Sequence, residues 1–101
     1  MEVSKVAMNR KPQLSFHVSI SNRRDGTIEA MTVLCSDDRV VRSEEVVAGQ
    51  LIVDYNSKGR VVAVEVLSSI KLNIILNYID DAAKQPFRKF MRTAPKELIT
   101  A

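Results

Sequence analysis

The sequence has no tryptophan and only one cysteine, one histidine, three glycines and three prolines among its 101 residues. The single cysteine, Cys35, excludes a disulfide within the chain and any zinc site built on several cysteines. The glycines stand apart at positions 26, 49 and 59, so the sequence contains no glycine-rich phosphate loop. No stretch reaches the ~18 uncharged apolar residues that a membrane-spanning helix needs. We therefore expect a cytoplasmic protein without cofactor or membrane contact.

Residues that could support catalysis or metal binding are few. His17 lies between Ser15 and Ser19, but the chain has no Gly-x-Ser-x-Gly motif that would mark a catalytic serine. Calcium loops need oxygen ligands at alternating positions around a glycine. Four acidic residues near one another in the sequence lack that spacing: Asp37, Asp38, Glu44 and Glu45. We predict no catalytic residue, no metal site and no enzymatic activity.

The length of 101 residues is typical of a single domain. Residues 1–13 show no hydrophobic period and no apolar run like the core of a signal peptide, which predicts a flexible N-terminal arm before a domain over residues 14–101. Charge is distributed unevenly. Residues 25–67 hold four basic and eight acidic side chains, whereas residues 68–101 hold six basic and three acidic ones. The basic ends would attract a nucleic acid, or the segments would attract one another in the fold.

Alternating apolar and polar residues predict strands in the first half of the chain. In residues 14–20, Leu14, Phe16, Val18 and Ile20 share one face, which indicates a half-buried strand. The polar turn cluster SNRRDG follows, and residues 28–34 are again rich in strand-forming residues. These two strands form a first predicted hairpin. A further short strand is expected at positions 40–41, at 46–47, or at both.

The sequence LIVDYNSKGRVVAVEVL, residues 51–67, predicts a second hairpin around a turn at residues 56–59. Gly59 can adopt positive φ, and the Asn56 side chain can bond nearby backbone. We expect Asp54 to accept hydrogen bonds from the turn backbone. Glu65 should face solvent or pair with a base such as Arg39 or Arg42.

Residues 70–83 form a long apolar-rich segment after Ser68 and Ser69, which are good N-cap residues. Its polar positions gather on one side of a helix, and this favours a helix over the strand that the alternation of residues 70–78 also allows. Pro86 should end this helix and open a second short one. Strands first and helices last predict an α+β fold: a curled antiparallel sheet of two hairpins, with four to five strands, followed by a C-terminal helix packed on one face.

The amino-acid sequence of residues 16–67 resembles the sequences of a family of small bacterial proteins called domain of unknown function 2283. The residues that carry this resemblance are Glu44-Glu45, Gly49, Ile52-Val53-Asp54-Tyr55, Gly59, Val61-Val62 and Glu65-Val66-Leu67. The sequence departs from the family pattern at Asn56, where an acid is usual, and at Ala63, where glycine is usual. The resemblance implies a fold with two hairpins and no settled activity. Because some members look like companions of toxin-like proteins, it also implies an antitoxin-like role as one alternative.

The apolar sector of residues 70–83 is about twice as wide as the ~100° stripe with which a helix covers a sheet. Excess apolar surface usually marks association, and a symmetric dimer is the commonest oligomer. We therefore predict a non-enzymatic protein-interaction module that forms a homodimer or binds an unidentified protein. The predicted interface residues are Ile75, Leu76, Ile79 and Ala83. Alternatively, residues 86–101 fold back and cover this sector themselves.

A basic cluster near the C-terminus interleaves with Phe87 and Phe90. On a helix the two phenylalanines should pack inward while the cations stay in solvent. Several cations on one exposed face would bind phosphates with an affinity that falls as salt rises. The second prediction is therefore a nucleic-acid-binding or antitoxin-like regulator that uses its basic ends, with contacts from Lys84, Arg88, Lys89 and Arg92.

Overall fold

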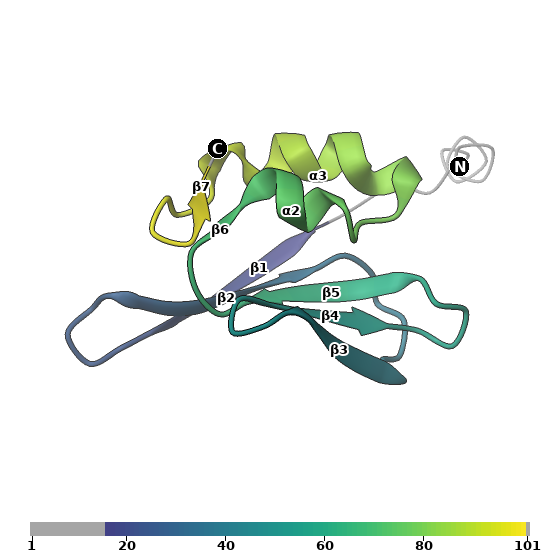
Figure 1. The fold of residues 1–101 in the computed structure, drawn as a ribbon, viewed down its shortest axis with the longest axis horizontal. Coiled ribbons are helices and arrows are strands. Elements are labelled where there is room, and N and C mark those ends of the chain that lie inside the picture. Colours follow the sequence, from purple (N-terminus) through teal and green to yellow (C-terminus); the bar gives the residue numbers. More distant parts are fainter. Residues whose placement is uncertain (1–15, 101) are drawn as a thin grey trace, which may run out of the picture.

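The computed structural model describes residues 16–100. The predicted arm, residues 1–13, and Leu14 of the first predicted strand lie outside this range. The main sheet has five antiparallel strands in the order β1-β2-β5-β4-β3 and is not closed. Its strands are β1 (His17–Asn22), β2 (Ile28–Leu34), β3 (Arg42–Val47), β4 (Leu51–Tyr55) and β5 (Val61–Val66). The predicted α+β class is confirmed, with a helical layer on one face of the sheet (Figure 1).

The turn between β4 and β5 forms as its residue types predict. Gly59 has φ +77°, and its N–H donates to the Asn56 carbonyl at 3.0 Å. The Asn56 side-chain oxygen accepts hydrogen bonds from the backbone N–H groups of Lys58 and Arg60, both at 2.9 Å. Asn56, rather than Asp54, therefore holds this turn.

A crossover joins β2 to β3 on the far edge of the sheet and runs past the β4–β5 turn. The backbone N–H groups of Cys35 and Ser36 donate to the Val62 carbonyl at 2.7 and 3.2 Å. Further along, the Asn56 side-chain amide donates to the Asp38 carboxylate at 3.0 Å. These bonds hold the connection between β2 and β3 against the β4–β5 hairpin.

The C-terminal third of the chain differs from the prediction of one helix over residues 70–83. It begins with a two-residue strand, β6 (Ile70–Lys71), which pairs in parallel with β7 (Ile99–Thr100). Two short helices, α2 (Leu72–Leu76) and α3 (Lys84–Phe90), lie between them with the 3₁₀ turns η1 (Asp81–Ala83) and η2 (Met91–Thr93).

The break after α2 has a physical reason in the width of the apolar sector. A single straight helix would leave part of this sector in water, whereas the bend at residues 77–80 directs Ile75, Leu76 and Ile79 into the core. The Asp80 carboxylate accepts a hydrogen bond from the Val61 N–H at 3.3 Å and ties the bend to β5. Pro86 lies in the first turn of α3. Backbone N–H groups in the first turn have no acceptor within the helix, so proline costs the helix no hydrogen bond there.

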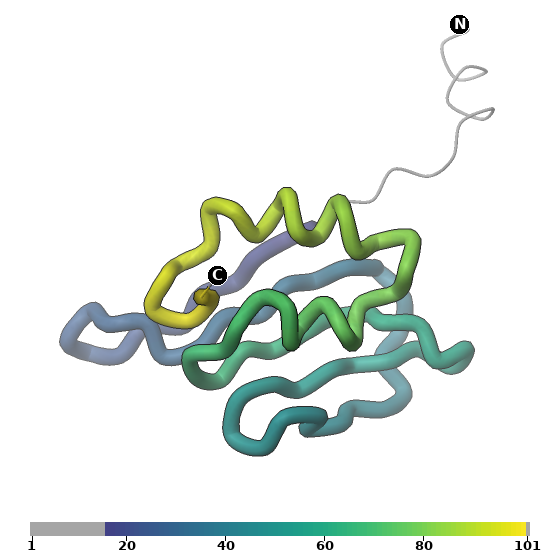
Figure 2. The backbone as a smooth tube through the Cα atoms, turned by 45° about the horizontal axis from the view of Figure 1, so that its top comes forward, coloured from purple at the N-terminus to yellow at the C-terminus, as the bar shows by residue number. Residues whose placement is uncertain are grey.

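The core fills the space between the sheet and the helical layer. Seen from above, α3 follows the β1–β2 side of the sheet and α2 follows the β5–β4 side (Figure 2). Phe87 is fully buried, and its ring meets that of Phe16 edge-on at 5.6 Å between centroids. The residues after Pro95 also belong to this core, because Leu98 and Ile99 are buried.

Candidate interaction surfaces

The predicted dimer residues lie inside a single chain. Ile75 is 0% exposed, Leu76 is 7% exposed and Ile79 is 5% exposed, while Ala83 is half-buried. Phe87, Met91, Leu98 and Ile99 belong to the same buried cluster. The chain's own C-terminal residues therefore cover the wide apolar sector, as the second alternative held. The exposed surface on which the dimer prediction rested does not exist at this position.

Exposed apolar side chains occur instead on β1, an edge strand of the sheet. Val18 is 39% exposed and Ile20 is 45% exposed, although their alternation resembles that of a buried face. The six residues of β1 extend about 20 Å, whereas the seven residues of α3 extend only about 10 Å. Because the helix is the shorter element, it covers Phe16 at one end of the strand and leaves Ile20 in the open.

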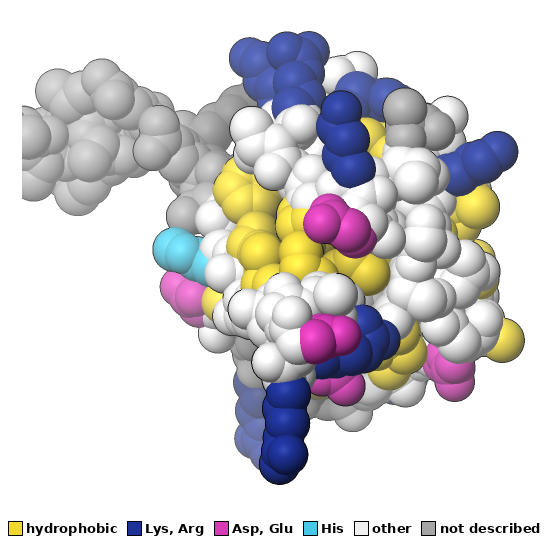
Figure 3. Space-filling view, turned by 90° about the vertical axis from the view of Figure 1, so that its left-hand side faces the viewer, with side chains coloured by type: hydrophobic (Ala, Val, Ile, Leu, Met, Phe, Trp, Pro, Cys, Tyr) yellow, Lys and Arg dark blue, Asp and Glu magenta, His cyan; other side chains and the backbone are white. Residues whose placement is uncertain are grey.

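An apolar groove of about 180 Å³ begins at these side chains. It lies between β1 and the end of the helical layer and is lined by Val18, Ile20, Met31, Phe90, Met91, Thr93, Ala94 and Pro95. Figure 3 shows hydrophobic side chains gathered in this hollow, between the helical layer above and the β1–β2 hairpin below. Sequence reasoning missed the groove, because exposure of β1 depends on where the distant helix ends.

Among residues 16–100, the outer edge of β1 also has no partner strand, since β1 pairs only with β2 in the sheet. Its sequence, HVSISN, carries no lysine, arginine, aspartate or glutamate. Edge strands without charge are the ones that accept another strand, because charged side chains normally block such pairing.

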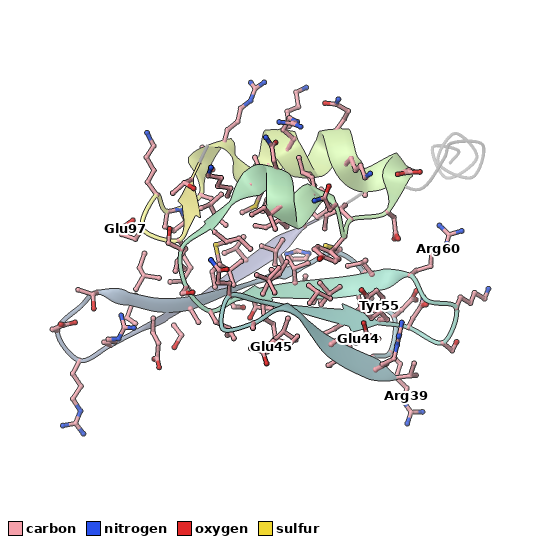
Figure 4. The ribbon with its side chains drawn as sticks, in the orientation of Figure 1. Arg39, Glu44, Glu45, Tyr55, Arg60 and Glu97 are labelled. Carbon is pink, nitrogen blue, oxygen red and sulfur yellow. The ribbon has the colours of Figure 1, made fainter. Side chains whose placement is uncertain are left out.

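The opposite edge strand, β3, is protected by charge. Arg42 forms an ion pair with Glu44 and lies over the Tyr55 ring, 4.4 Å from its centroid. Glu45 accepts a hydrogen bond from the Gly49 N–H at 2.6 Å. Figure 4 shows Glu44 beside Tyr55 near the end of the sheet and Glu45 on the side away from the helices. The two edges of one sheet therefore differ in their capacity for strand addition.

The basic cluster of the C-terminal segment lies on the outer surface of α3 and of the turn η2 that follows it. Arg88, Lys89 and Arg92 are exposed, and Lys84 is half-buried and paired with Asp81 at 3.0 Å. Phe87 points inward, as predicted. Lysine and arginine side chains gather at the top of Figure 3, above the hydrophobic hollow. This surface presents cations to solvent on the side of the molecule away from the sheet.

Two acidic residues meet on the face of the sheet that the helices leave open. Asp54 is 8% exposed and accepts a hydrogen bond from the Ser43 hydroxyl at 2.6 Å. Burial raises the pKa of Glu65, and hydrogen bonding and charge from Asp54 raise this pKa further. Glu65 therefore lies against another acid and not against the base that the sequence suggested.

This arrangement predicts a pH effect on stability. The folded chain binds a proton at Glu65 more tightly than the unfolded chain does, so this group's contribution to stability falls as pH rises from 4.5 through the raised pKa. Glu65→Gln, which keeps the shape without the charge, should raise the free energy of unfolding at pH 7 and weaken its dependence on pH. Urea unfolding between pH 4.5 and pH 7 measures both, with Glu97→Gln as an exposed control. A steeper dependence in Glu65→Gln than in the wild type would contradict this assignment.

Cys35 is half-buried and does not have the character of a reactive thiol. Burial, together with the charge of Asp80, raises the pKa of the Cys35 thiol to about 12. The thiol therefore stays protonated at neutral pH and is a poor nucleophile. Among residues 16–100, no group of three histidine, cysteine, aspartate or glutamate side chains has the arrangement of a metal site. The described helices include none that is long and apolar enough to cross a bilayer.

Residues 25–69 match the family described as "Protein of unknown function (DUF2283)". No curated protein and no solved structure matches the chain. The matched segment comprises β2 to β5, whereas β1, the apolar groove's helical wall and the basic surface of α3 lie outside it. The match supports the resemblance to the DUF2283 family, whose members are proteins of unknown function, over this central segment.

Proposed function

We propose that this protein is a non-enzymatic protein-interaction module that assembles as a homodimer, and that β1 with its apolar groove is the association surface. The observation that carries the proposal is the combination of an open, uncharged strand edge with the exposed side chains of Val18 and Ile20. Pairing of this edge would satisfy backbone groups and remove apolar surface from water at the same time. The proposal moves the predicted dimer contact from residues 75–83 to the other side of the helical layer.

The same proposal places the module in the reducing cytoplasm of a bacterium. A chain whose single cysteine is free suits a reducing compartment. The protonated thiol also supports the non-enzymatic assignment, since a cysteine nucleophile acts as a thiolate. An unidentified protein that offers an extended segment could use the same edge, but a second copy of the chain is always present at a matching concentration.

Charged side chains on β1 test the homodimer. We expect the wild type to show twice the chain mass of 11.3 kDa by light scattering, and Val18→Lys/Ile20→Lys to show 11.3 kDa. Two lysines would place like charges opposite each other in the paired strands. The matched control is Val41→Lys, because Val41 is 56% exposed and lies outside both β1 and the groove. A wild type that stays monomeric at high concentration, or a lysine variant that stays dimeric, would refute the proposal.

A nucleic-acid-binding or antitoxin-like regulator is the second candidate function. It is supported by the exposure of Arg88 and Lys89 on α3 and of Arg92 on the adjoining turn η2. Grooves of about 420 and 320 Å³ flank Arg88, and their linings include Lys84, Lys89 and Arg92. Binding to a phosphate backbone would depend on these cations and would weaken as salt rises.

Heparin chromatography separates the two candidates. If the regulator function holds, the wild type should elute at elevated salt, and Arg88→Gln/Lys89→Gln/Arg92→Gln should elute much earlier. Arg23→Gln/Arg24→Gln, which removes exposed charges from the β1–β2 turn, is the matched control for net charge. Equal elution of the wild type and the α3 variant would remove the nucleic-acid candidate and leave the dimer proposal untouched.

A further inference from the structure

We infer that two copies of the chain join β1 to β1 in antiparallel orientation, with Ser19 of each copy on the two-fold axis. This inference rests on the proposed homodimer and specifies how its two halves meet. The partner is a second copy of the same chain, and the product is one continuous ten-stranded sheet, because each copy contributes five strands. Three features of β1 lead to this arrangement: its open edge, its alternation and its lack of charge.

The alternation of β1 follows from its pairing with β2. Val18 lies opposite Val33 and Ile20 lies opposite Met31, on the face that carries the helices. Ser19 lies opposite Thr32 on the other face of the sheet. Residues directly opposite each other in an antiparallel pair share a face. A symmetric pair of β1 strands must therefore match even-numbered residues with even ones and odd-numbered residues with odd ones.

Only three such registers let the two strands overlap over most of their length. They differ in which apolar side chains face each other. Centring on Ser19 sets Val18 against the second copy's residue 20, so both exposed aliphatic side chains of each copy find an apolar partner. Centring on Val18 sets Ile20 against residue 16, and Phe16 is already packed against Phe87 and Phe90. Centring on Ile20 leaves Val18 opposite the polar Asn22. The Ser19-centred register is the one that sets each exposed aliphatic side chain of β1 against another exposed aliphatic side chain.

The polar side chains on the other face of β1 also fit this register. Ser19 meets its own copy, and His17 meets the second copy's residue 21, a serine, so no like charges face each other. A two-fold axis perpendicular to the sheet keeps both helical layers on one side. The second copy's aliphatic side chains then lie over the mouth of the groove, beside Ile20 and Met31. Five paired residues in each strand form an interface smaller than the roughly 1,600 Å² of a standard one, so we expect reversible association.

Disulfide trapping tests the register. In a Cys35→Ser background, Ser19→Cys should form a crosslinked dimer as the major species under mild oxidation, because directly opposed residues lie within disulfide reach. Ser21→Cys should stay largely uncrosslinked by itself, but it should crosslink when mixed with His17→Cys. Ser19 and Ser21 are exposed, so their replacement by cysteine should leave urea unfolding nearly unchanged.

The outcomes separate the register from the proposed function. Crosslinking by Val18→Cys or Ile20→Cys in preference to Ser19→Cys would overturn the register, while light scattering would still report a dimer. A dimer in which no β1 cysteine crosslinks would overturn β1 pairing altogether. A monomer at all concentrations, with the edge covered by residues 1–15 or by another protein, would overturn the homodimer as well as the register.

Discussion

Phe87→Ala is expected to lower the free energy of unfolding by about 3–5 kcal/mol, which is a large part of the roughly 5–15 kcal/mol typical of a domain. The Phe87 side chain is 0% exposed and lies at the contact between α3 and the sheet. Its truncation would leave a cavity and remove the edge-on contact with the Phe16 ring. Because the chain has no tryptophan, urea unfolding is best followed by circular dichroism.

Phe90→Ala is the matched control. Phe90 is on the same helix and also contacts the Phe16 ring, at 5.2 Å between centroids, but it is only half-buried. We expect a clearly smaller loss for this variant. If the two variants lost the same stability, or if Phe87→Ala lost less than about 1 kcal/mol, the helical layer would not unfold together with the sheet.

Ser43→Ala should cost about 1–3 kcal/mol of folding stability. The Ser43 hydroxyl donates to Asp54 at 2.6 Å, and Asp54 is 8% exposed, so solvent has little access to replace the lost donor. A buried acceptor that loses its partner keeps the full cost of its desolvation. Chemical denaturation of both proteins under the same conditions gives the difference.

Ser19→Ala provides the comparison for this substitution, because Ser19 is exposed on β1 and points to the same open face of the sheet. Its effect should stay within about 0.5 kcal/mol. A loss for Ser43→Ala no greater than that of Ser19→Ala would show that Asp54 obtains another donor after the substitution. Measuring all variants at one protein concentration removes any contribution of association from the comparison.

The strands could be predicted from the sequence because their signals are local. Asn56 and Gly59 specify their turn through side-chain bonding and positive φ, both of which act within four residues. Alternation then assigned β2, β4 and β5 close to their observed bounds. The bends of the helical layer could not be predicted in this way. Ile70 becomes a strand residue because it pairs with Ile99, and no local pattern marks a contact between residues so far apart in the chain.

The burial of the predicted interface residues could not be foreseen for a related reason. The width of the apolar sector around Ile75 and Ile79 was a correct observation, but the sequence does not state what covers it. Residues 87–99 cover it in the structure. Conversely, Val18 and Ile20 have the alternation of a core strand, and their exposure follows from the short length of a helix that begins more than sixty residues later. Whether an apolar residue is buried depends on such distant partners.

The parallel pairing of β6 with β7 has a consequence for the order of folding. The strands of the main sheet all lie before residue 67, and its three hairpins can form from neighbouring segments while the chain is being synthesised. The helical layer, however, is held at both ends by Ile70 and Ile99, so it cannot close until β7 has left the ribosome. During that interval Val53 and Val64 would be exposed to water, and the nascent sheet would be at its most prone to aggregation.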